Sequence, residues 1–146
     1  MGPLLVIDGL TKRFGPLTAV NDVSFRLHRG EVLGFLGPNG AGKSTTMRMI
    51  TGYLAPSSGR VCVCGLDLAT APIEARRRIG YLPEGAPAYG DMTPLGLLRF
   101  TAALRGFDGA TKSRRVDAMV DLLELKSVLR QPIEALSKGF KRRVGL

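Results

Sequence analysis

Residue types that commonly build metal and base-binding sites are scarce in this sequence. It contains no tryptophan, a single histidine and only two cysteines in 146 residues. A cysteine and histidine metal site needs more ligands than these, because His28 lies far from Cys62 and Cys64 in the sequence. The two cysteines alternate with valine in a strand-like run, which predicts buried thiols on one strand face. A redox or metal role for them is the alternative.

Long apolar runs are also missing. No stretch approaches the roughly 20 apolar residues that a membrane-spanning helix needs. The apolar run at residues 4–7 is short and has no charged segment before it, so we expect no signal peptide. We therefore expect a soluble protein in the cytoplasm.

Positive charge, by contrast, is abundant, with a formal net charge of +9. Much of it lies in three clusters: Arg76, Arg77 and Arg78; Lys112, Arg114 and Arg115; and Lys141, Arg142 and Arg143. The clusters are best interpreted as solvated helix faces, with contact to a membrane surface or another subunit as the alternative. Nucleic acid is not expected as a partner, because few aromatic residues lie beside the clusters to stack on bases.

The most informative feature is a glycine-rich stretch that fills the Walker A pattern G-x-x-x-x-G-K-[ST]. Its residues are Gly37, Pro38, Asn39, Gly40, Ala41, Gly42, Lys43, Ser44 and Thr45. Its glycines can turn successive backbone N–H groups inward to bind an anion, and the following helix adds unpaired amides. Lys43 would then reach the β- and γ-phosphates of a nucleotide, and Ser44 would ligate magnesium.

The surroundings of this stretch fit a phosphate-binding loop. The short, mostly apolar run at residues 31–36 before it predicts a buried parallel strand. Residues 45–50 after it predict a helix that stops near Gly52. Because strand, glycine loop and helix follow in the required order, we prefer this interpretation to a flexible glycine turn that binds nothing.

The rest of the chain divides into a first part rich in strands and a second part rich in helices. We expect strands at residues 4–10, 23–27, 61–64 and 79–82, and a short helix at residues 72–78. Thr93 and Pro94 are typical of a helix start, and further helices are predicted at residues 113–125 and from Ser137 onward.

These residues together resemble the ATP-binding subunit of ABC transporters along nearly the full length of the chain. Residues 136–140, Leu-Ser-Lys-Gly-Phe, are similar to the family signature Leu-Ser-Gly-Gly-Gln, and they too open a helix. The resemblance implies an α/β P-loop NTPase fold with an antiparallel β subdomain, an ATP-binding core and a helical subdomain, incomplete at the C-terminus. It divides this single domain into residues 1–86, 87–136 and 137–146.

The resemblance also assigns roles to individual residues. Phe14 matches the aromatic residue that stacks on adenine, with a core or turn phenylalanine as the alternative. Glu84 takes the Q-loop position, where most members have a glutamine that contacts magnesium. Ser137 and Gly139 are retained from the signature and would contact the γ-phosphate of ATP bound to a second subunit. Lys138 and Phe140 depart from the usual signature, as in an exporter-type bacterial branch.

The family pattern continues with a Walker B aspartate, a catalytic glutamate and a switch histidine beyond the signature, which this sequence does not contain before Leu146. We therefore expect an N-terminal portion that binds ATP weakly and is inactive as an ATPase by itself. Asp8 ends a hydrophobic run but is followed by no glutamate, so we do not expect it to replace the missing aspartate.

The resemblance implies ATP and Mg²⁺ as cofactors. It implies a transmembrane permease and a second ATP-binding subunit, identical or different, as partners, at the inner face of the cell membrane. Two other classes stay open. One is a soluble ABC ATPase without a membrane partner, although such proteins usually carry tandem domains or long insertions. The other is a P-loop kinase or a nucleotide-binding module without turnover.

Overall fold

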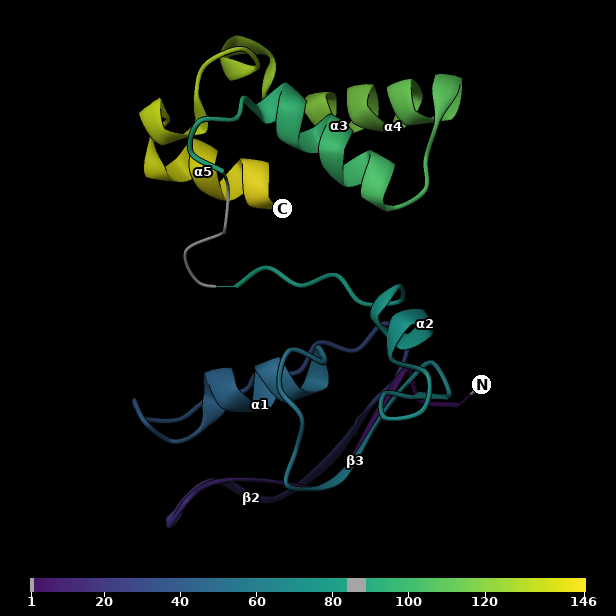
Figure 1. Ribbon diagram of the computed structural model, residues 1–146, viewed down its shortest axis with the longest axis vertical. Helices are drawn as coiled ribbons and strands as arrows, with labels where there is room; N and C mark the ends of the chain where they lie inside the picture. The colour runs from purple at the N-terminus through teal and green to yellow at the C-terminus, as the bar shows by residue number, and fades with distance from the viewer. Residues whose placement is uncertain (1, 84–88) are drawn as a thin grey trace. The chain divides into compact units, whose positions relative to one another are not determined.

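The computed structural model describes residues 2–83 and 89–146 of the chain. These residues form two compact units, Met1–Tyr81 and Leu82–Leu146. The first unit contains the sheet and the glycine-rich loop, and the second is helical (Figure 1). The mixed α/β content with an antiparallel sheet confirms the predicted fold class.

A four-stranded antiparallel sheet is the framework of the first unit. Its strands are β1 (Leu5–Phe14), β2 (Leu17–Leu27), β3 (Ser58–Val63) and β4 (Leu66–Asp67), in the spatial order β2-β1-β3-β4. A tight turn at Gly15 joins β1 to β2, so that Phe14 pairs with Leu17 and Leu5 with Leu27. β1 and β2 are longer than the predicted strands at residues 4–10 and 23–27, because polar residues such as Lys12 and Arg13 also pair across the hairpin.

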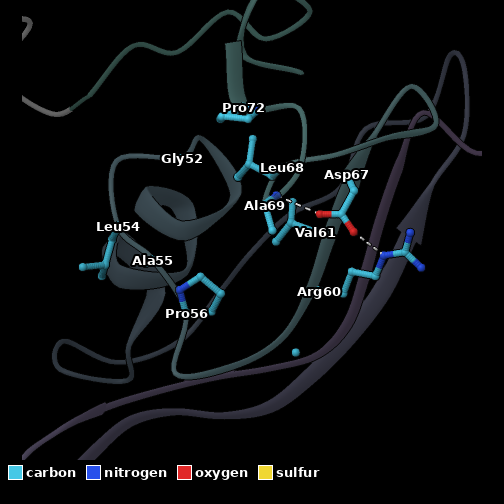
Figure 2. A pocket seen from close by; sticks show the side chains of 11 residues that line it. Gly52, Leu54, Ala55, Pro56, Arg60, Val61, Asp67, Leu68, Ala69 and Pro72 are labelled. Carbon is cyan, nitrogen blue, oxygen red and sulfur yellow. Dashed lines mark hydrogen bonds and ion pairs between the residues drawn. The ribbon is translucent and has the colours of Figure 1, made fainter. Parts of the chain in front are cut away.

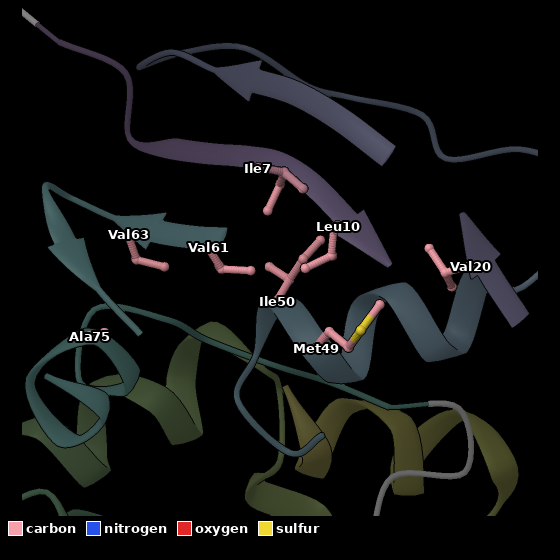
Figure 3. Close-up of a cluster of buried hydrophobic side chains, with 8 residues drawn as sticks. All are labelled: Ile7, Leu10, Val20, Met49, Ile50, Val61, Val63 and Ala75. Carbon is pink, nitrogen blue, oxygen red and sulfur yellow. The ribbon is translucent and has the colours of Figure 1, made fainter. Parts of the chain in front are cut away.

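Two helices complete this unit, α1 (Lys43–Ile50) and α2 (Pro72–Arg76). Figure 3 shows how α1 lies along one face of the sheet, with apolar side chains of both pointing toward each other. The buried set is Ile7, Leu10, Val20, Met49, Ile50, Val61, Val63 and Ala75. Because α1 begins at Lys43, within the glycine-rich stretch, this core holds the end of the loop against the sheet.

Two strand predictions are wrong. Residues 31–36 form a segment without strand pairing, and most of its apolar side chains are exposed, Val32 by 99% and Leu36 by 93%, whereas Phe35 is half-buried beside Phe25. Residues 79–82 are likewise outside any strand. A buried parallel strand needs a neighbour for its backbone groups, and the described residues supply none to either segment.

The cysteine prediction also fails in part. Cys62 lies on β3 between two buried valines and is half-buried, whereas Cys64 is exposed. Cys64 is not a strand residue, because it forms a two-residue turn with Gly65 between β3 and β4. Both turn residues have positive φ, 50° and 79°, as in the hairpin turns that match strand twist. The turn directs the thiol of Cys64 to solvent.

The described residues of the second unit form α-helices joined by short 3₁₀ turns. The elements are α3 (Pro94–Leu104), α4 (Gly109–Leu122), η1 (Lys126–Val128), η2 (Ile133–Ala135) and α5 (Lys138–Gly145). The expected cap of α3 is confirmed, since the Gly96 N–H donates to Thr93 Oγ1 at 3.1 Å. Ala102 of α3 packs with Val116 and Val120 of α4. A second cluster, with Leu125, Ile133, Leu136 and Val144, anchors α5.

Candidate functional site

The glycine-rich loop is shaped by two glycines with left-handed backbones. Gly40 has φ 83° and Gly42 has φ 70° and ψ 36°, angles that residues with a Cβ rarely adopt. At Gly42 there is also no room, because a Cβ there would overlap the carbonyl oxygen of Ala19 on β2. Glycine is therefore required at this position both by the backbone angles and by the close approach of the strand.

The start of α1 presents unpaired backbone amides next to the loop. Thr46 is the first residue whose N–H closes a helical hydrogen bond, to the Gly42 oxygen at 3.2 Å, and its buried hydroxyl donates to the same oxygen at 2.8 Å. The first turn contains no acidic residue, and Ser44 is exposed there. Free amides and the positive end of the helix dipole make this turn favourable for an anion.

Lys43 brings a positive charge to the same place. Its Nζ donates to the carbonyl oxygens of Gly37 at 2.8 Å and Pro38 at 3.1 Å. The side chain thus folds back over the loop and does not extend into solvent. The Lys43 ammonium and the unpaired amides at the start of α1 together supply the kind of donors that bind a polyphosphate.

Phe14 lies at the end of β1 and is 48% exposed. Phe14 pairs with Leu17 of β2. Ala19 follows two residues later on β2, and the carbonyl of Ala19 lies against Gly42. The aromatic residue and the end of the glycine-rich loop are therefore linked by a few residues of β2. In Figure 1 the β1–β2 turn and the loop before α1 lie toward the same side of this unit. An exposed ring near a phosphate loop can stack on a base.

The signature residues lie in the second unit, at the start of α5. Ser137 caps this helix, with its Oγ accepting a hydrogen bond from the Phe140 N–H at 3.4 Å. Ser137, Lys138 and Gly139 are all exposed, so the helix start is open to a ligand or to another chain. The predicted helix start is confirmed here.

Two further candidates have different outcomes. Glu84, the expected magnesium ligand, lies outside the described residues. Asp8 lies on β1 opposite Arg60 of β3, within the sheet ladder. Among the described residues, no three side chains of histidine, cysteine, aspartate or glutamate gather into a metal site.

A separate hollow of about 420 Å³ lies between the end of α1 and the β3–β4 hairpin (Figure 2). Apolar residues such as Leu54, Val61 and Leu68 line it, and no residue of the glycine-rich loop does. At its edge Arg60 Nε donates to Asp67 Oδ2 at 2.6 Å, and the Ala69 N–H donates to Asp67 Oδ1 at 2.7 Å. The Ala69 amide, together with Arg60, holds the pKa of Asp67 below its usual value. These bonds stabilise the hairpin.

Comparison with known proteins decides the family. The model of the ABC transporter family matches residues 20–146, which include both the glycine-rich loop and the signature. The chain belongs to the ABC transporter family. The adenine-stacking candidate Phe14 lies just before the matched region.

Named relatives agree with this membership. The chain is 40% identical over 137 residues to a probable multidrug ABC transporter ATP-binding protein of Escherichia coli, covering 94% of this chain and 24% of that protein. It is 36% identical over 142 residues to a Nod factor export ATP-binding protein of Ralstonia nicotianae, covering 97% and 44%. This ABC family chain therefore spans less than half the length of these relatives.

A solved structure supports the fold. It is the structure of an ATP-binding subunit of an ABC transporter, and it matches this chain with a TM-score of 0.86 at 33% identity. The match covers 97% of this chain and 59% of the other. No helix in the described part of the ABC family chain is long and apolar enough to cross a membrane.

Sequence reasoning missed some residues that shape this site. Ala19 limits position 42 to glycine, and Thr46 holds the loop end from its buried position. Lys12, whose Nζ lies 5.2 Å from the centre of the Phe14 ring, was also missed. The sequence does hold a signal for Lys12: it lies two residues before Phe14, and residues i and i+2 share one face of a strand.

Proposed function

We propose that this chain is the ATP-binding part of an ABC transporter ATPase. The geometry that carries the proposal is the loop itself, in which Gly42 is held against Ala19 and Lys43 lies over the loop carbonyls. A triphosphate would take the place of those carbonyls as the partner of the Lys43 ammonium, and the first-turn amides of α1 would bind its oxygens.

The loop, from Gly37 to Thr45, would bind the phosphates, and the base would stack on Phe14. Mg²⁺ fits this site through Ser44, because magnesium commonly takes one or two protein oxygens and completes its coordination with phosphate oxygens and water. Ser44 is exposed at the helix start, as that role requires. Bound there, Mg²⁺ would neutralise charge on the phosphates; Glu84 is a second proposed ligand.

Ser137 and Gly139 would act on ATP bound by a second ATP-binding subunit. Ser137 Oγ accepts from the Phe140 N–H, and its exposed hydroxyl can still donate its own proton to a γ-phosphate, together with the N–H of Gly139 in the first turn of α5. ATP would then join two such domains, and hydrolysis would release them. A transmembrane permease at the inner face of the membrane would convert that cycle into transport, in keeping with the export named for the Ralstonia nicotianae relative.

Within the proposed domain, residues 1–86 would form the β subdomain and phosphate-binding core, and residues 87–136 the helical subdomain. Residues 137–146 would form the signature and the helix that follows. A soluble ABC ATPase without a membrane partner is the second candidate class. A nucleotide-binding module without turnover is the third.

The test of nucleotide binding is the variant Lys43→Ala, measured by calorimetric titration with MgATP. We expect its affinity to fall at least tenfold, about 1.4 kcal/mol, because the ammonium group held over the phosphates is lost. Arg48→Ala is the matched control, since Arg48 is an exposed cation on the same helix, in its last turn.

Equal affinity of Lys43→Ala and the parent protein, with both folded by circular dichroism, would refute the proposed function. An equal loss in Arg48→Ala would show a general charge effect and would equally contradict the assigned role. In the same samples we expect no phosphate release by the parent chain above the level of Lys43→Ala, because no residue of the 146-residue chain matches the glutamate with which the family orients the attacking water.

A further inference from the structure

The end of β1 is attached to a distant segment of the chain by three hydrogen bonds. The segment is residues 55–57, between α1 and β3. Ser57 N–H donates to the Thr11 oxygen at 2.8 Å, and Arg13 N–H donates to Ser57 Oγ at 3.0 Å. Lys12 Nζ donates to the Ala55 oxygen at 2.7 Å. The strand that carries Phe14 is therefore held on this side by one backbone hydrogen bond and by two hydrogen bonds that involve the side chains of Ser57 and Lys12.

Lys12 makes a second contact from the same position. Its ammonium lies 5.2 Å from the centre of the Phe14 ring, within the range of a cation–π interaction. The hydrogen bond to Ala55 favours this position of the flexible side chain, so the cation is held near the ring. One charged group thus joins three parts of the first unit: β1, the segment at residues 55–57 and the aromatic ring.

The ring has two faces, and the Lys12 cation attracts the electron density of the face that it covers. A purine stacked on the opposite face would meet a ring that is fixed in position and polarised by the cation. Without the cation, the half-exposed ring at the end of a hairpin would be free to change rotamer. If the Phe14 ring is already fixed, less side-chain entropy is lost when the base binds.

We propose that Lys12 is a positioning residue for the base of the nucleotide, holding the Phe14 ring from one face so that a purine stacks on the other. The inference rests on the proposed function, because it requires Phe14 to be the base-stacking residue. It adds a residue and a tether, Lys12 to the Ala55 oxygen, that act on the base and not on the phosphates.

A purely structural role for Lys12 makes a different prediction. If Lys12 only fastened β1 to residues 55–57, its loss would weaken binding of every ligand of this unit equally. If it acted as a general attractive charge, it would favour any polyphosphate, and its neighbour Arg13, an exposed cation on the same strand, would do the same. Only a positioning role for the ring depends on the presence of a base.

The experiment compares MgATP with magnesium tripolyphosphate, which has phosphates but no base, by calorimetric titration of the whole 146-residue chain. In Lys12→Met we expect ATP affinity to fall about three- to fivefold, as an exposed cation–π contact allows. Tripolyphosphate affinity should change less than about twofold, which is below the smallest cation–π contribution. Lys12→Arg should restore ATP binding, and Arg13→Met should leave the ratio of the two affinities unchanged.

The double variant with Phe14→Ala makes the test sharper. Once the ring is gone, Lys12→Met should cause no further loss of ATP affinity. An equal loss for both ligands in Lys12→Met, or an additive loss in the double variant, would overturn the inference. If Phe14→Ala itself lowers both affinities equally, the base-stacking assignment is wrong and the inference falls with it. If the parent chain does not bind ATP, the proposed function has failed.

Discussion

The contact between the phosphate loop and β2 predicts a difference between two glycines of the loop. Gly40 and Gly42 both have left-handed backbones, with φ 83° and 70°. A Cβ on Gly40 would meet nothing within 4 Å, whereas a Cβ on Gly42 would overlap the Ala19 oxygen. The variants Gly40→Ala and Gly42→Ala therefore share backbone strain and differ in the steric overlap with Ala19 and Val20 of β2.

The structure sets the expected size of this difference. A left-handed backbone costs alanine about 1–2 kcal/mol, which is the whole effect expected for Gly40→Ala. In Gly42→Ala the main chains of the loop and β2 must also separate, at a further cost of about 1–3 kcal/mol, the range for an overpacked site. The expected totals are about 1–2 kcal/mol for Gly40→Ala and about 2–5 kcal/mol for Gly42→Ala.

Urea unfolding followed by circular dichroism measures both values. With a slope of about 2 kcal/mol per molar urea, the midpoint should fall by about 0.5–1 M in Gly40→Ala and by about 1–2.5 M in Gly42→Ala. MgATP affinity should fall most in Gly42→Ala, because the separation moves the start of α1. Equal midpoints for the two variants would refute the proposed close contact between Gly42 and Ala19.

The other predictions concern the hairpin turn and the signature. Cys64→Asn should stabilise the protein by about 0.5–1 kcal/mol, because asparagine tolerates the positive φ of 50° at this turn better than cysteine does. Thermal unfolding measures this, and a midpoint for Cys64→Asn no higher than that of the control Cys64→Ala would contradict the assigned turn. In a longer chain that contains the Walker B and switch residues, Ser137→Arg should leave ATP affinity of the monomer within about twofold and abolish ATP-driven dimerisation. Light scattering checks this, and mixing with a Lys43→Ala chain should restore some turnover; loss of ATP binding by the Ser137→Arg monomer would exclude action on a second subunit.

Local sequence patterns were sufficient for much of this protein. The glycine-rich pattern predicted a helix directly after the loop, and α1 begins at Lys43. Thr93 and Ser137 predicted the starts of α3 and α5, because a cap depends on a hydroxyl and amides only three residues away. Two short motifs, the glycine-rich loop and the signature, also predicted the family and with it the fold class. The family match confirms this prediction.

Other features depended on residues that are distant in sequence. Apolar residues 31–36 looked like a buried strand, yet a strand is defined by its neighbours, and the described residues provide none for it. Cys64 fitted the alternation of β3 and became a turn residue, because the register of Val63 with Leu66 leaves it between the strands.

The same is true of the site. The motif identified Gly42, but its partner, the Ala19 oxygen of β2, came only from the folded chain. The tether from Lys12 to Ala55 crosses 43 residues of sequence. A motif determines which chemical groups are present and how far apart they lie along the backbone. Tertiary packing decides which of them meet, because each such contact needs two segments brought together by the burial of a common core.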